Sequence, residues 1–211
     1  MSIQDSIRQI SESAQKPIII ARAKSLRRLD LACGQVPAAG YEGVDLYAPQ
    51  AAHKVDLQSY PWPFEDNSVE AIRCSHYIEH IPCDVVRGGP RDGQDALFAF
   101  FDECYRIMAD GADLHISCPS ARSSRAFQDP THRRFIVAET FLYMNKEWRE
   151  LNKLDHYRVS CNFGINVNPV ILTEVDKSRV DAWKQMAFAH YWNVIMDWDA
   201  HLKCLKGAKV S

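Results

Sequence analysis

The sequence predicts an α/β fold built on an open, mostly parallel sheet, and two short runs carry this prediction. Residues 29–34, Leu-Asp-Leu-Ala-Cys-Gly, read as an apolar strand that leads into an acid and a turn of small residues. Residues 43–46, Gly-Val-Asp-Leu, read as a second strand that also ends in an acid. Ligands of open parallel sheets bind outside the carboxyl ends of the strands, so we expect Asp30 and Asp45 to share one rim.

The residue types at this rim favour a nucleoside pocket. Small residues at Ala32 and Gly34 let the backbone approach a ligand closely, and Asp45 can accept hydrogen bonds from both hydroxyls of a ribose. After Gly34 the next glycines are Gly40 and Gly43, which does not match the G-x-G-x-x-G spacing of dinucleotide sites. An NAD-dependent oxidoreductase is therefore disfavoured.

Length and composition indicate one globular domain. The chain has 211 residues, of which 46% are hydrophobic and 25% charged, enough to bury a core. A formal charge of −2 gives no global reason to expect nucleic acid as a partner. The seven cysteines form no C-x-x-C pair, which indicates neither a disulfide framework nor a zinc knuckle. We expect a cytoplasmic protein without a membrane anchor, because no signal peptide or spanning segment is recognised.

Two features precede and follow the first strand. Ile3, Ile7 and Ile10 recur at helical spacing, so residues 1–25 are assigned to an N-terminal helical extension, which covers either the ligand or a sheet edge. Only nine residues separate the glycine at 34 from the valine at 44, too few for a crossover helix and its turns. We therefore expect the helix after the first strand to be reduced to a turn.

Further elements follow in order along the chain. We expect a short third strand at residues 53–57, a fourth from residue 69, an amphipathic helix at 94–108 and a fifth strand at 113–118. The Asp-Gly pair at 110–111 is expected to stop the helix.

The most specific run is Ser-His-Tyr-Ile-Glu-His-Ile at residues 75–81, which follows the proline-rich loop Tyr-Pro-Trp-Pro-Phe-Glu-Asp-Asn-Ser at 60–68. Together with residues 29–34, these runs resemble the class I S-adenosylmethionine-dependent methyltransferases, in particular the methyltransferase type 11-like group. In that group the corresponding runs read apolar-Asp-Leu-Gly-Cys-Gly and Ser-His-x-x-Glu-His-Ile, and here Ala32 replaces the first glycine. The resemblance covers residues 26–141.

The resemblance implies a fold, a cofactor and a reaction. It implies a Rossmann-like, doubly wound sheet of seven strands, mostly parallel with an antiparallel last strand, with helices on both faces, and we assign residues 26–176 to this domain. It implies S-adenosyl-L-methionine as cofactor and methyl transfer to an unidentified small-molecule or macromolecular acceptor. The cofactor-binding residues that it implies are Asp30, Ala32, Cys33, Gly34, Asp45, Leu46, Asp56, Leu57, Ser75, His76 and Tyr77.

Two histidines are candidate proton acceptors, because the imidazole titrates near neutrality. His76 is one, and His132 in the Asp-Pro-Thr-His run at 129–132 is the other, since that run recurs in the same group. The alternative for residues 129–132 is a turn that bonds to itself. His80 is expected inside a helix, bonded to backbone or to an acid. We assign no metal, because Asp129 and His132 would need partners that the sequence does not identify.

The loop around His132 also carries four arginines, which favour a phosphate or carboxylate acceptor. They are Arg122, Arg125, Arg133 and Arg134.

The last third of the chain predicts two more elements. Residues 157–164 and 169–175 read as a hairpin with its turn at 166–168. Apolar residues at helical spacing predict a helix at 181–205, so residues 177–211 are assigned to a C-terminal helix. That helix either contacts a second subunit in a homodimer or packs on its own sheet.

A second hypothesis for the function of the protein also stays open. The protein could be a non-catalytic module with the methyltransferase fold that serves as a partner subunit or a cofactor sensor. Ala32 and the short first crossover support that reading, whereas the intact run at 75–81 opposes it.

Overall fold

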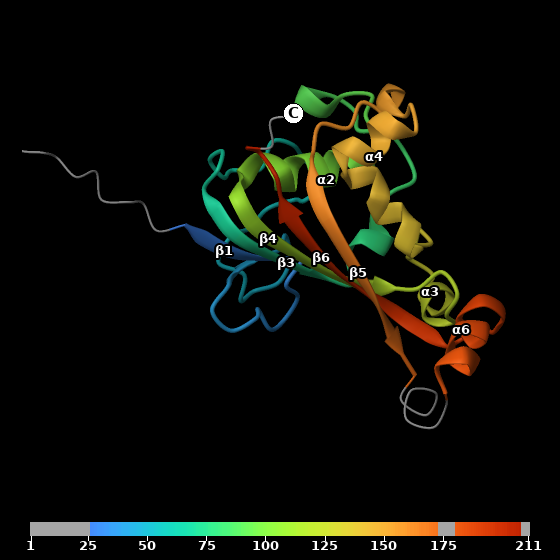
Figure 1. Cartoon of the computed structure of the whole chain (residues 1–211). Helices are drawn as coiled ribbons and strands as arrows, with labels where there is room; N and C mark the ends of the chain where they lie inside the picture. The colour runs from blue at the N-terminus through green and yellow to red at the C-terminus, as the bar shows by residue number, and fades with distance from the viewer. Residues whose placement is uncertain (1–25, 173–179, 208–211) are drawn as a thin grey trace, which may run out of the picture.

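The structure is a computed structural model that describes residues 26–172 and 180–207 (Figure 1). The N-terminal helix expected within residues 1–25 lies outside the described residues. The strands are β1 (Arg27–Leu31), β2 (Glu42–Val44), β3 (Val69–Ser75), β4 (Met108–Pro119), β5 (Phe163–Ile171) and β6 (Ile195–Cys204). The α-helices are α2 (Ala96–Ile107), α3 (Arg125–Gln128), α4 (Lys146–Leu151) and α6 (Asp181–His190). Short 3-10 helices are η1 (Ile78–His80), η2 (Gly89–Arg91), η3 (Ala138–Met144) and η4 (Asp155–Tyr157).

The strands form one mixed sheet in the order β2-β1-β3-β4-β6-β5. Strands β1 to β4 are parallel to one another, whereas β6 is antiparallel to both β4 and β5. The predicted α/β class is confirmed, but the described residues contain six strands instead of seven. The missing strand is the one expected at 53–57, which is reduced to a single bridge between His53 and Val44.

The core lies between the sheet and α2. Alternate residues of β4 point into it, and Leu114 and Ile116 are buried, as period-two alternation requires. From α2, Phe100 and Phe101 meet edge to face with ring centroids 5.5 Å apart. Asp95 caps the helix by accepting a hydrogen bond from the amide of Leu97, so the helix expected at 94–108 is confirmed. It ends before β4, so the Asp-Gly pair at 110–111 lies in the strand and does not stop the helix.

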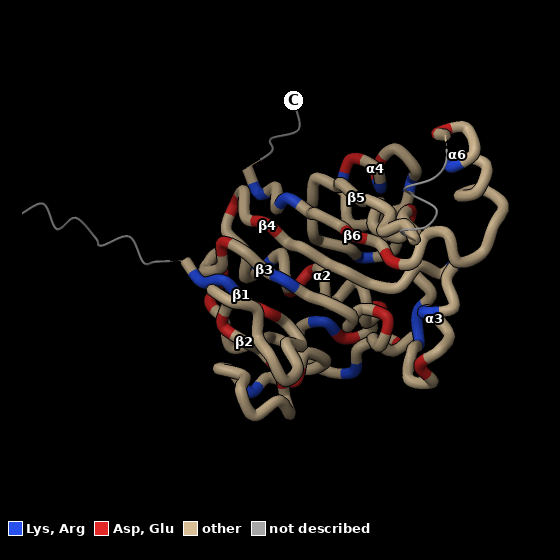
Figure 2. The backbone as a smooth tube through the Cα atoms, turned by 90° about the horizontal axis from the view of Figure 1, so that it is seen from below, with Lys and Arg blue, Asp and Glu red and all other residues tan. Residues whose placement is uncertain are grey.

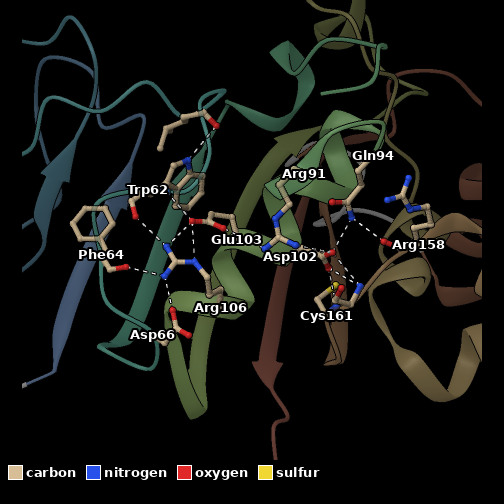
Figure 3. A network of polar contacts seen from close by, with 12 residues as sticks. Trp62, Phe64, Asp66, Arg91, Gln94, Asp102, Glu103, Arg106, Arg158 and Cys161 are labelled. Carbon is tan, nitrogen blue, oxygen red and sulfur yellow. Dashed lines mark hydrogen bonds and ion pairs between the residues drawn. The ribbon is translucent and has the colours of Figure 1, made fainter. Parts of the chain in front are cut away.

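Two adjacent buried acids tie α2 to distant parts of the chain (Figure 3). Glu103 accepts hydrogen bonds from the amide of Trp62 and from Arg106, which also donates to the carbonyl of Phe64. Asp102 accepts from the amide of Cys161 at 2.7 Å and from other donors nearby. The helix therefore positions both the proline-rich loop after residue 60 and the segment that leads into β5.

A short loop replaces the helix of the first crossover, as the sequence predicts. The amide of Ala38 in this loop donates to Asp30 at 2.8 Å, which holds the loop against β1. Gly43 in β2 faces the same loop, and a Cβ atom at this position would lie 2.8 Å from both Cys33 Sγ and Pro37 Cγ. The close approach of loop and strand therefore requires glycine there.

Two predictions for the last third of the chain are wrong. The hairpin expected around residues 166–168 is a single edge strand, β5, whose partner is β6. Pro169 is tolerated there because an edge strand has one unpaired side. The helix expected at 181–205 ends at His190, and residues 195–204 form β6. Here the alternation of buried Ala200, Leu202 and Cys204 with more exposed residues outweighs the helical spacing of the same segment.

The homodimer expected through this C-terminal helix stays a prediction. Helix α6 lies beside α3 at one end of the sheet (Figure 1), where Arg122 donates to the carbonyl of Phe188 at 2.7 Å. Among the described residues, no helix combines the length and the apolar content needed to cross a bilayer. Basic and acidic positions are interspersed along the described backbone (Figure 2).

We predict that Gly43→Ala destabilises the protein by about 1–3 kcal/mol, because the added methyl group overlaps Cys33 and Pro37. Gly164→Ala is the matched control in another strand, since its nearest neighbour, Lys203 Cβ, would lie at an ordinary 3.6 Å. Urea unfolding of both variants measures the difference. Equal stabilities would show that the loop moves away from β2 without cost.

Candidate functional site

Three strands of the sheet end level with one another and define one rim. Leu31 of β1 is in register with Val44 of β2 and with Cys74 of β3, so the residues that follow all emerge at one edge. Ala32 and His76 follow β1 and β3 with φ angles of 52° and 53°, in the left-handed region. Backbone strain of this kind in non-glycine residues clusters at functional sites.

A pocket of about 390 Å³ opens at this rim, within the range of small-molecule and cofactor sites. Six of the predicted cofactor-binding residues line it, from the ends of β1 and β2, the segment after β2 and the residue after His76. They are Ala32, Asp45, Leu46, Asp56, Leu57 and Tyr77. The structure therefore brings together residues up to 45 positions apart in the sequence, as the rim argument requires.

Asp45 is held in place by the backbone. Its Oδ1 atom accepts hydrogen bonds from the amides of Tyr47 and Ala48 at 2.8 Å, and Oδ2 accepts from Gly34 at 3.2 Å. Burial raises the pKa of this carboxyl, but the hydrogen bonds from Ala48, Tyr47 and Gly34 outweigh burial and hold the pKa below its usual value. Asp45 is thus a fixed anion, and a carboxylate with about four acceptor sites retains one for a ligand.

The other wall of the pocket carries a second acid and an aromatic ring. Asp56 accepts from the amide of Gln58 at 2.9 Å and from the hydroxyl of Ser59 at 2.8 Å, so its carboxylate is also fixed. Burial raises the pKa of Tyr77, which keeps its phenol neutral. The pocket therefore combines two carboxylates with the apolar side chains of Leu46 and Leu57.

Sequence reasoning missed three residues that line the same pocket, Tyr47, Val55 and Gln58. Each is a direct neighbour of a predicted residue, namely Leu46, Asp56 or Leu57. Val55 lies in the strand that the sequence predicts at 53–57, next to Asp56, so the sequence alone could have placed it at the pocket. Tyr47 and Gln58 gave none, because loop geometry alone turns them toward the pocket.

Asp30 does not line the pocket. Its side chain is fully buried, with Oδ1 bonded to Arg73 at 2.9 Å and Oδ2 to the amide of Ala38. Both oxygens therefore have protein partners, and Asp30 stabilises the loop that shapes the rim. Of the remaining predicted residues, Gly34 donates to Asp45, and Cys33 packs beside Gly43. Burial, followed by the charges of Asp45 and Asp30, raises the pKa of the Cys33 thiol.

On the other side of the rim, Ser75 ends β3 and His76 follows with its side chain half exposed. The amide of His76 donates to the carbonyl of Ser117 at 2.8 Å, and its Nδ1 atom lies 3.3 Å from Oε1 of Glu79. Interaction with Glu79 raises the pKa of His76 despite the opposing effect of partial burial. His80 lies in η1, as expected, and its ring contacts that of His132, with centroids 4.7 Å apart.

The four arginines expected to favour an anionic acceptor bind protein groups instead. Arg122 donates to the carbonyl of Phe188, Arg125 pairs with Asp197, and Arg133 donates to the carbonyl of Pro130. Arg134 donates to the carbonyl of Ile81 and pairs with Asp95. These arginines therefore organise the loops around the rim and give no support for a phosphate or carboxylate acceptor.

The fold agrees with a known class of structure. No protein-family model matches the chain, and no curated protein matches it by sequence. Among solved structures, the chain is similar to a SAM-dependent methyltransferase from Archaeoglobus fulgidus, with 17% identity over 95% of this chain and 94% of that one and a TM-score of 0.56. This likeness shows that the chain has the Rossmann-like fold of SAM-dependent methyltransferases.

Two other solved structures align over most of their length. A S-adenosylmethionine-dependent methyltransferase from Mesorhizobium loti has 14% identity over 96% of this chain and 100% of that one, with a TM-score of 0.47. A putative methyltransferase from Haloferax volcanii, in complex with the activator Trm112, has 12% identity over 95% and 90%, also with a TM-score of 0.47.

The role of Asp30 can be tested through its partner. We predict that Arg73→Met destabilises the protein by about 3–5 kcal/mol, because it leaves a buried carboxylate without its counter-charge. Arg27→Met is the control: Arg27 also pairs at 2.9 Å, but with the partly exposed Glu42, so the loss should stay below about 1 kcal/mol. Chemical unfolding measures both. A small effect at Arg73 would mean that Asp30 is not held by this pair.

Proposed function

We propose that the protein is an S-adenosyl-L-methionine-dependent methyltransferase. The observation that supports this proposal most directly is the pocket at the rim, where Asp45 directly follows β2 and Asp56 lies in the next segment beside Leu57. The fold is that of SAM-dependent methyltransferases. The motif at residues 75–81 is placed on the same rim by β3.

The residues of the pocket suit each part of the cofactor. In the proposal, the remaining acceptor site of Asp45 takes a hydrogen bond from a ribose hydroxyl. Asp56 accepts from the amino group of the adenine, and Leu46 and Leu57 contact its ring. Ala32 and Gly34 allow the backbone to approach the methionine half, together with Cys33 and Ser75. When bound, the cofactor supplies a methyl group that its sulfonium already activates, so the chain mainly has to align the acceptor and exclude water.

The acceptor site would lie beside His76, beyond the methionine half. That His76 or His132 accepts a proton from the acceptor stays a prediction. We do not extend the proposal to an anionic acceptor, because the nearby arginines are paired with protein groups.

The alternative, a non-catalytic partner subunit or cofactor sensor with this fold, is favoured by the left-handed conformation of Ala32, where a glycine would be unstrained. Both proposals predict cofactor binding, and only the first predicts turnover. Release of S-adenosylhomocysteine from the protein with a panel of hydroxyl, amine and thiol acceptors, monitored by mass spectrometry, distinguishes them.

We predict that Asp45→Ala weakens S-adenosylmethionine binding about 10- to 100-fold in titration calorimetry, because the hydrogen bond that its remaining acceptor site takes from the ribose is lost. Asp56→Ala should weaken it about 10-fold through loss of a single contact. Asp113→Ala is the control, since this exposed acid pairs with Lys203 away from the rim, and its binding should match that of the parent protein.

Asp45 also holds the loop around residue 47, so thermal unfolding of Asp45→Ala must first show that the variant is folded. Unchanged affinity in both the Asp45 and Asp56 variants would refute the placement of the adenosine in this pocket.

A further inference from the structure

Two sequence motifs that the cofactor pocket does not use meet next to the rim. Glu79 and His80 come from η1, and His132 comes from the loop after α3. One potential ligand atom from each of the three lies within 4.8 Å of the other two. Backbone hydrogen bonds hold η1 and the loop of His132 together, because the amides of Arg133 and Arg134 both donate to the carbonyl of Glu79, at 2.7 and 3.0 Å.

The surroundings determine which nitrogen of each imidazole carries the proton. Thr131 donates its hydroxyl proton to Asp129 at 2.7 Å, so its oxygen is left to accept from Nδ1 of His80 at 3.0 Å. Nδ1 of His132 lies 3.0 Å from the carbonyl of Ala126, which can only accept. These contacts favour the tautomer of each ring that has its proton on Nδ1 and leaves Nε2 as the ligand atom.

Glu79 adds a third acceptor. Its side chain is 2% exposed, and neither carboxylate oxygen receives a hydrogen bond. The nearest donor, Nδ1 of His76, is 3.3 Å from Oε1 without hydrogen-bond geometry, and Oε2 has no donor at all. Glu79 is thus a buried carboxylate that has an ion pair with the half-exposed His76 but no hydrogen bond, which is costly. A cation held together with one ligand atom each from His80 and His132 would satisfy it.

We propose that Glu79, His80 and His132 bind a divalent transition metal of the zinc type. Two histidines and one glutamate, with an open fourth position, form a known zinc ligand set. The Nδ1 partners Thr131 and Ala126 supply the outer hydrogen bonds that orient metal-binding histidines. Zinc–ligand distances of about 2.0–2.1 Å place tetrahedral ligand atoms about 3.4 Å apart, so small side-chain rotations close the site.

A second cluster, of two histidines and an aspartate, shows why acceptors without hydrogen bonds matter. His115, Asp199 and His201 also converge, on β4 and β6. There, however, the Nε2 atoms of both rings contact the carboxylate of Asp199, so the three groups satisfy one another. This cluster needs no ion and provides the matched control.

The test is direct zinc binding by the full-length chain, treated with EDTA and without S-adenosylmethionine. Titration calorimetry with Zn²⁺ should show one site in the parent protein, weakened about 100-fold or more in both Glu79→Gln and His132→Ala. The control variant His201→Ala should retain the parent affinity. A Cys83→Ser variant checks that the exposed Cys83 thiol is not a ligand.

Thermal unfolding provides a second readout. Without metal, Glu79→Gln should be at least as stable as the parent, because it removes a buried charge. Added Zn²⁺ should raise the melting temperature of the parent but not that of Glu79→Gln. Equal zinc affinity in the parent and Glu79→Gln, no binding by the parent, or a loss confined to His201→Ala would overturn the proposal. None of these results depends on methyl transfer, so the proposed function would stand or fall separately.

Discussion

The candidate site depends on the level ending of three parallel strands. Because Leu31, Val44 and Cys74 are in register, the chain leaves β1, β2 and β3 at one height. A shift of one residue in β2 would turn Asp45 to the other side of the sheet and remove it from the pocket. Asp30 of β1 bonds to Arg73 of β3 and to the loop after β1, which supports this register. The pocket therefore depends on strand pairing as well as on the loops.

The buried acids of the protein divide into two kinds. Asp30, Asp102 and Glu103 each receive hydrogen bonds from arginines or backbone amides and join segments distant in sequence. Glu79 is equally buried, yet among the described buried carboxylates it is the one in which neither oxygen is hydrogen-bonded. Glu79 has only the ion pair with the half-exposed His76, and this contrast with the hydrogen-bonded acids supports the metal site that we propose.

The sequence predicts the first half of the fold and most of the pocket, because both depend on local patterns. The runs at 29–34, 43–46 and 75–81 each combine a strand with the residues just after it, and strand direction then determines where those residues lie. The last strand could not be recognised, because residues 195–204 carry helical and alternating spacing at once and only pairing with β4 decides between them. The partners of His132 could not be found either, since Glu79 approaches it only through tertiary contact.

The order of the strands has a consequence for how the sheet can form during synthesis. Strand β6 lies between β4 and β5, although it is synthesised after both. Until residues 195–204 have emerged, β5 has no described neighbour in the sheet and β4 presents a bare edge. Until β6 is made, the partly formed sheet therefore has an unpaired edge at β4, and such an edge can pair with other chains.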